Sequence, residues 1–129
     1  MSNSYKLRYS LNQYSQSLDR FYEAIQVKDE TLAIDGTIQR FEFTFELAWK
    51  TIKIFLQHEG ILCNSPRSCL KEAFSLGLIN FEAIWLNMLD DRNKLAHIYN
   101  EQEAKEIYSR ISEYYEELNS LKISLGKII

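Results

Sequence analysis

The most constraining feature of this sequence is the spacing of its apolar residues, which recur at alternating steps of four and three. The first stripe comprises Leu7, Leu11, Tyr14, Leu18, Phe21 and Ile25. Steps of this kind place the side chains on one face of an α-helix. The stripe therefore predicts a long helix over residues 4–27 that buries one face.

A second stripe begins after a charged stretch in which Thr31 is a candidate N-cap. It comprises Ile34, Ile38, Phe41, Phe45, Ala48, Ile52 and Phe55. Further apolar residues cover much of the remaining helix surface, and a helix that is apolar on most sides lies centrally in its domain. The sequence therefore predicts that this second helix is the centre of the fold.

One strip of the second helix stays polar and contains Glu42 and Glu46, two like charges four residues apart. Such a pair is mildly unfavourable unless a cation from elsewhere lies between the carboxylates. A solvated face with an ion pair between Glu46 and Lys50 is favoured over a functional pair of carboxylates.

Capping residues mark the shorter helices that follow. Gly60 suits a helix C-terminus, and Ser65 followed by Pro66 predicts a helix over residues 66–75 that ends at Gly77. Asn80 then precedes a helix with the sequence FEAIWLNMLDDRN, which is expected to fade after Asp91.

A last helix is predicted after Asn100, because Glu103 three residues later completes a capping arrangement. Its apolar stripe comprises Ala104, Ile107, Ile111, Tyr114, Leu118 and Leu121. About five helices with short connections predict an all-α, up-and-down helical bundle, with residues 1–129 forming one domain. Stripes of this spacing suit pairing between chains as well as packing within one chain, so a homodimer is an open alternative.

The charge balance limits the possible partners. Fifteen Lys and Arg residues against eighteen Asp and Glu give a formal charge of −3, which is the wrong sign for a protein that coats nucleic acid. Any contact with RNA must therefore be local. The polar N-terminus and the lack of a run of about eighteen apolar residues predict a cytoplasmic protein without a membrane segment. Cys63 and Cys69 do not have the spacing of a zinc site and are expected to be reduced thiols.

The segment DDRNKLAHIYNE, residues 90–101, carries the chemistry-bearing side chains. Arg92 offers a fixed cation for a phosphate, His97 titrates near neutral pH, and Tyr99 supplies a hydroxyl group. These groups suit the cleavage of a phosphodiester by an RNA 2′-hydroxyl. The chain lacks the common motifs of nucleotide-binding, hydrolytic and metalloprotease sites, and no metal or cofactor is expected.

Helix geometry constrains this segment. A separation of five residues rotates by about 140° in an unbroken helix, so Arg92 and His97 would not share one face. Either the helix ends near Lys94 and His97 folds back, or two chains related by a two-fold axis line one cleft. A structural role for His97 at the helix end is the alternative to catalysis.

The run from Arg92 through Asn93 to His97 resembles the signature of the HEPN superfamily, in which Arg is followed after four to six residues by His. With Tyr99 two residues beyond His97, it looks like the HepT toxins of HepT/MntA toxin–antitoxin pairs. The segments IQRFEFTFELAWKTIK, SPRSCLKEAFSLGLI and IWLNMLDDRN are also similar to the bacterial family named nucleotidyltransferase substrate-binding proteins. The resemblance implies a HEPN-like bundle dimer, encoded beside a minimal nucleotidyltransferase.

The toxin resemblance implies a metal-independent endoribonuclease of a type VII-like toxin–antitoxin pair. His97 would then act as general acid or base, and Arg92 would stabilise the charged phosphorane. Asn93 would orient the substrate or His97, with Asp91 as a supporting residue. The nucleotidyltransferase antitoxin would neutralise the toxin by transferring AMP to Tyr99.

The older family name implies a different function, a non-catalytic subunit that binds a substrate for a two-component nucleotidyltransferase. The chain itself lacks the Gly-Ser turn and spaced aspartates that nucleotidyl transfer requires. If the third and fourth helices are adjacent, a local basic cleft for RNA is expected from Arg67, Lys71, Arg92 and Lys94. Trp49 and Trp85 are expected in the core, and packing or a dimer contact is expected for Tyr108, Tyr114 and Tyr115.

Overall fold

The structure is a computed structural model, and the part of the chain that it describes contains six α-helices joined by short connections. The structure describes residues 2–27, 31–97 and 100–129, and the side chains within these ranges except those of residues 2–4, 31 and 97. The helices are α1 (Ser2–Gln26), α2 (Thr31–His58), α3 (Pro66–Ser75), α4 (Glu82–His97), α5 (Glu101–Tyr108) and α6 (Ile111–Ile128). None of the helices in these ranges is long and apolar enough to cross a membrane.

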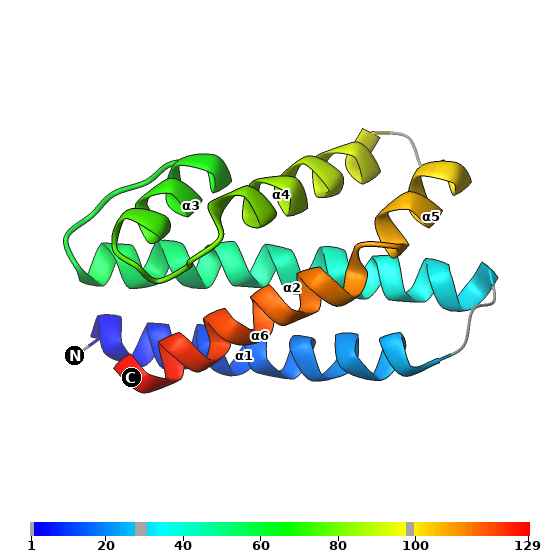
Figure 1. Cartoon of the computed structure of the whole chain (residues 1–129). Helices are drawn as coiled ribbons and strands as arrows, with labels where there is room; N and C mark the ends of the chain where they lie inside the picture. Colours follow the sequence, from blue (N-terminus) through cyan, green and yellow to red (C-terminus); the bar gives the residue numbers. More distant parts are fainter. Residues whose placement is uncertain (1, 28–30, 98–99) are drawn as a thin grey trace.

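The long helices run alternately in opposite directions, with both chain ends at the same end of the molecule (Figure 1). Helix α2 lies between α1 on one side and the pair α3 and α4 on the other, while α6 crosses α1 and packs on it (Figure 1). The predicted all-α, up-and-down bundle is therefore confirmed, and α2 is its centre because it is apolar on most sides. Trp85 is fully buried and Trp49 is partly buried against the core, as expected.

Small hydroxyl side chains line the contact between α1 and α2. Three threonines of α2 are buried and spaced seven residues apart: Thr37, Thr44 and Thr51. The hydroxyl of Thr44 lies 2.8 Å from that of Ser17, and the hydroxyl of Thr51 lies 2.6 Å from that of Ser10. Because Ser10 and Ser17 are also seven residues apart, the two antiparallel helices meet in one fixed register. This register fixes the position of α2 and of the acidic side chains that it carries.

The predicted helix ends are confirmed at four places. Gly60 and Gly77 have φ values of 81° and 77°, the left-handed conformation that follows a helix C-terminus. Ser65 caps α3 in a reciprocal arrangement with Ser68, and the side chain of Asn100 accepts a hydrogen bond of 3.1 Å from the backbone N–H of Glu103. These caps fix where α3 and α5 begin.

Two helices differ from the sequence-based expectation. Helix α4 does not fade after Asp91 but continues to His97. The last predicted helix is divided into α5 and α6 at Ser109 and Arg110, where the backbone N–H of Arg110 donates to the carbonyl of Ile107, a tighter turn than that of an α-helix. The apolar stripe continues across this break, which is why periodicity alone did not detect it.

The prediction of reduced cysteine thiols is wrong in this structure. Cys63 and Cys69 form a disulfide, with their Cα atoms 5.2 Å apart. The prediction rested on the rarity of disulfides in the cytosol, whereas the local geometry is set by α3. Its first turn begins at Pro66 and returns Cys69 to the loop that carries Cys63.

Candidate functional site

Four of the predicted site residues, Asp91, Arg92, Asn93 and His97, lie on the last two turns of α4. The structure describes the side chains of Asp91, Arg92 and Asn93. The backbone of His97 ends α4, but its side chain lies outside the described residues, as does the whole of Tyr99. The surroundings of the first three residues are therefore the part of the predicted site whose geometry is described.

Arg92 is held by hydrogen bonds to two different helices. One terminal nitrogen donates to Oε2 of Glu46 on α2 at 2.5 Å, and the other donates to Oδ1 of Asn93 on α4 at 3.0 Å. The Arg92 side chain is 25% exposed and that of Glu46 is 33% exposed. The guanidinium group is thus fixed in orientation while it stays accessible to a ligand.

The cation that the like-charged pair of Glu42 and Glu46 on α2 requires is Arg92. The pKa of Glu42 is raised by burial, and the positive charge of Arg92 offsets part of this rise. Burial acts to raise the pKa of Glu46 as well, but the hydrogen bond from Arg92 and the charges of Arg92 and Lys50 lower it below its ordinary value. The expected ion pair between Glu46 and Lys50 is also present, at 3.6 Å. The polar strip of α2 is therefore part of the Arg92 environment as well as a solvated face.

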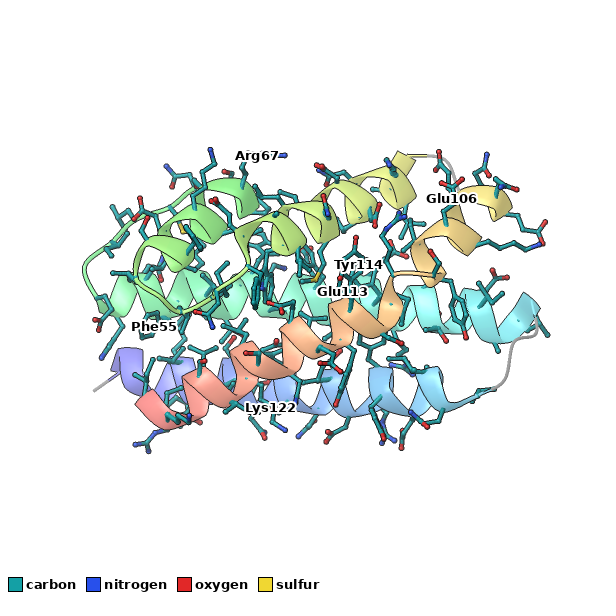
Figure 2. The ribbon with its side chains drawn as sticks, viewed as in Figure 1. Phe55, Arg67, Glu106, Glu113, Tyr114 and Lys122 are labelled. Carbon is teal, nitrogen blue, oxygen red and sulfur yellow. A yellow bond between two sulfur atoms is a disulfide. The ribbon has the colours of Figure 1, made fainter. Side chains whose placement is uncertain are left out.

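Asp91 faces a different set of partners from its neighbour Arg92. It is 3% exposed and accepts two hydrogen bonds of 2.9 Å from the guanidinium group of Arg110. The hydroxyl of Tyr114 donates to the same carboxylate at 2.5 Å. Figure 2 shows Tyr114 on the first turn of α6, on the side that faces α4. Asp91 therefore ties α4 to the junction between α5 and α6.

The hydrogen bond to Asp91 raises the pKa of Arg110, and burial together with the same carboxylate raises the pKa of Tyr114. Both groups thus keep their protons and donate to Asp91 throughout the physiological pH range. The expected packing role of the tyrosines is confirmed for Tyr114, which stacks on Phe41 with ring centroids 5.3 Å apart, and for Tyr115, which contacts Phe21.

The continuity of α4 decides how Arg92 and His97 relate within one chain. The helix runs unbroken from Glu82 to His97, so the first of the two alternatives, a helix that ends near Lys94, does not hold for this described helix. Positions five residues apart are rotated by about 140° around such a helix. Within one chain, the backbone therefore directs positions 92 and 97 to different faces.

The residues of the expected basic cleft lie on adjacent helices, because α3 packs against α4. Three of the four are paired with carboxylates: Arg67 with Asp90 at 3.3 Å, Arg92 with Glu46, and Lys94 with Asp91 at 4.0 Å. Arg67 lies on the outer side of α3 (Figure 2). The basic charge of this surface is thus partly neutralised by acidic side chains.

A groove of about 690 Å³ lies between α1 and α2. It is lined by Gln13, Gln16, Ser17, Asp19, Arg20, Glu23, Arg40, Phe43, Glu46 and Leu47. Glu46 is common to this groove and to the Arg92 ion pair, whereas Arg92 itself is not one of the lining residues. Within the described ranges, no group of three His, Cys, Asp or Glu side chains is placed to hold a metal ion.

Sequence reasoning did not identify Glu46, Arg110 or Tyr114 as neighbours of the predicted site. A signal existed for Glu46, since an acidic pair at i and i+4 requires a cation. Arg110 and Tyr114 gave no such signal, because their contact with Asp91 depends on the bend between α5 and α6.

Comparisons with known proteins agree with this fold. A family model described as "Nucleotidyltransferase substrate binding protein like" matches residues 9–127. A protein of Haemophilus influenzae named "Probable ribonuclease HepT" is 34% identical over 114 residues, which cover 82% of this chain and 77% of that protein.

Two solved structures are similar to this chain. A crystal structure of a protein from Thermus thermophilus has a TM-score of 0.82 and 31% identity, covering 87% of this chain and 98% of that chain. A structure of a protein from Haemophilus influenzae has a TM-score of 0.69 and 26% identity, covering 93% of this chain and 96% of that one. Its structure is described as revealing the fold of a substrate-binding domain of a nucleotidyltransferase.

Proposed function

The chain belongs to the nucleotidyltransferase substrate-binding-protein-like family, and we propose from this membership that it is a metal-independent endoribonuclease toxin. In this proposal it acts on cytoplasmic RNA as one half of a type VII-like toxin–antitoxin pair. A minimal nucleotidyltransferase is the antitoxin and transfers AMP to the hydroxyl of Tyr99. The similarity to the "Probable ribonuclease HepT" of Haemophilus influenzae supports this function.

The observation that carries the proposal is the position of Arg92. Its guanidinium group is oriented by Glu46 and Asn93, a quarter of the side chain is exposed, and it lies on the helix that ends at His97. A fixed and accessible guanidinium is suited to a phosphodiester, whose charge grows as the phosphorane forms.

The proposed reaction requires one base and one acid. The RNA 2′-hydroxyl loses its proton to a general base and attacks the adjacent phosphorus, and the bond to the 5′-oxygen breaks. That oxygen takes up a proton, and a 2′,3′-cyclic phosphate remains on the other product. His97 moves these protons, Arg92 stabilises the negative charge on the phosphorane, and Asn93 helps to orient the reacting groups.

We propose that the active form is a homodimer. Because α4 is continuous to His97, positions 92 and 97 of one chain are directed to different faces. A two-fold axis beside α4 would bring Arg92 of one chain and His97 of the other to a shared cleft. The site is then complete only when both chains are present.

The test is expression of the chain alone, compared with a His97→Ala variant. Growth arrest and RNA cleavage that disappear in the variant are expected. When the nucleotidyltransferase partner is added, mass spectrometry of the peptide that contains Tyr99 should show the mass of AMP. A wild-type chain that neither arrests growth nor cleaves RNA contradicts the proposal.

A second candidate is a non-catalytic subunit that binds a substrate for a nucleotidyltransferase partner. The groove between α1 and α2 favours it, because about 690 Å³ falls within the usual range of small-molecule sites. In that case the partner's nucleotidyl transfer to its acceptor should depend on this chain, and the His97→Ala variant should support it as well as the wild type does.

A further inference from the structure

The ion pair between Glu46 and Arg92 joins two helices that are far apart in the sequence. Glu46 lies near the middle of α2, and its partner lies five residues before the end of α4. α2 is held in register by the buried threonine contacts with α1. The carboxylate of Glu46 is therefore presented from a helix whose register against α1 is fixed.

We infer that Glu46 is a positioning residue for Arg92: it fixes the guanidinium orientation and moderates the positive charge that a phosphate meets. This inference rests on the proposed ribonuclease function for its catalytic consequence. The orientation effect itself depends only on the contact between the two side chains.

The geometry accounts for the orientation effect. An arginine side chain has several rotatable bonds and stays mobile unless its terminal nitrogens are bound. Glu46 binds one terminal nitrogen from α2, and Asn93 binds the other from α4. With both ends bound, the remaining N–H groups of the guanidinium point in a fixed direction, which is what stabilisation of a phosphorane requires.

The acidic surroundings account for the charge effect. Glu46 is ionised near neutral pH, because the hydrogen bond from Arg92 and nearby cations lower its pKa. Glu42, one helical turn earlier, also interacts with the charge of Arg92. An anionic ligand must share the guanidinium with Glu46, so binding in the ground state is weakened while orientation is preserved.

Two substitutions of Glu46 separate these effects. Glu46→Ala removes the acceptor and the charge, whereas Glu46→Gln keeps an amide oxygen that can accept the same hydrogen bond. If the Ala variant does not fold, Glu46→Asp replaces it, because it withdraws the carboxylate by one methylene group. Glu72→Gln on α3 is the matched control, since it removes one exposed acidic charge away from Arg92.

The first readout does not depend on activity. NMR of arginine side chains labelled with ¹⁵N, with the Arg92 signal assigned from an Arg92→Lys variant, reports rotation about the terminal C–N bonds. Rotation should be slow in the wild type and in Glu72→Gln, intermediate in Glu46→Gln and fast in Glu46→Ala. Rotation that is the same in the wild type and Glu46→Ala overturns the inference.

The second readout is steady-state RNA cleavage, with thermal unfolding measured in parallel. For Glu46→Ala we expect kcat to fall by about tenfold to a hundredfold, and KM to be lowered as in Glu46→Gln, because both variants remove the charge of Glu46. For Glu46→Gln we expect kcat within about threefold of the wild type and a lower KM, because the charge of Arg92 is less neutralised. Equal losses of kcat in both variants contradict a positioning role. A wild-type chain that cleaves no RNA contradicts the proposed function, and the NMR signal then decides the inference alone.

Discussion

The guanidinium group of Arg110 donates two hydrogen bonds, both of 2.9 Å, to the carboxylate of Asp91. Asp91 precedes Arg92 on α4, and neighbouring residues of a helix point about 100° apart. The side chain of Asp91 therefore faces the junction of α5 and α6, whereas the side chain of Arg92 reaches α2. One helical turn is thus held from two sides, which fixes the rotation of α4 about its own axis.

We predict that Asp91→Asn destabilises the fold. The side chain of Asp91 is only 5% exposed, so its ion pair with Arg110 is largely shielded from water on the acidic side. The substitution removes the negative charge and leaves the Arg110 cation without its charged partner. Because Arg110 is 36% exposed, the expected loss is moderate for a buried pair, about 2–3 kcal/mol in the free energy of unfolding. Unfolding in urea measures this loss.

The neighbouring Asp90→Asn provides the control. Asp90 forms an ion pair with Arg67 in which both side chains are more than half exposed. Such pairs contribute little, so the expected change is below about 0.5 kcal/mol. Similar losses for the two variants would show that the contacts of Asp91 do not fix α4.

The sequence predicted the elements of the fold well, since apolar periodicity and caps act locally. Gly60, Ser65 and Asn100 mark helix boundaries through contacts within a few residues, and these boundaries are confirmed. The division of the last helix was missed because Ile107 and Ile111 keep the helical spacing across the bend at Arg110.

The contacts around the candidate site could not be predicted from the sequence, and the predicted site residues stay a prediction. The pattern of Arg92 and His97 is visible in the sequence, whereas the contact between Arg92 and Glu46 joins residues that are 46 positions apart. Such contacts depend on how whole helices pack. The disulfide between Cys63 and Cys69 was missed for another reason, since the expectation came from the cellular compartment and not from local geometry.

Reduction of the disulfide between Cys63 and Cys69 is predicted to lower stability. The closed loop is short, with a sequence separation of 6, and loop-closure entropy for a loop of this size corresponds to about 2 kcal/mol. Urea unfolding with and without a reductant should show this difference in the wild type. A Cys63→Ala, Cys69→Ala variant is the control, because a reductant should not change its stability. Alkylation of both cysteines in the folded, unreduced protein would contradict the presence of the bond.

The contribution of Glu46 to stability is predicted to depend on pH. Its pKa in the folded chain is lowered from 4.5, so the stabilisation is present above the unfolded-state pKa and is lost as pH falls through the lower, folded-state value. Glu46→Gln should therefore lower the free energy of unfolding at pH 7, by less than about 1 kcal/mol because the pair is partly exposed, and by less at pH 3.

Glu42→Gln is the comparison for this pH effect. The pKa of Glu42 is raised, mainly by burial, so its ionised form is less favourable in the folded chain than in the unfolded chain. Glu42→Gln should therefore be at least as stable as the wild type at pH 7. Equal losses for Glu46→Gln at pH 7 and pH 3 would contradict the ion-pair explanation.

A shared site in a dimer makes a distinct prediction for mixtures of two inactive chains. Arg92→Ala and His97→Ala are each expected to abolish RNA cleavage alone. In a mixed dimer, the intact Arg92 comes from the His97→Ala chain and the intact His97 comes from the Arg92→Ala chain. If each site takes one residue from each chain, one of the two sites of a mixed dimer is intact. Random mixing makes about half of the dimers mixed, so about a quarter of the wild-type activity should be restored. If both residues came from the same chain, neither site would be intact and the mixture would stay inactive. The experiment thus tests whether the unbroken α4 separates the two residues within one chain and the dimer reunites them.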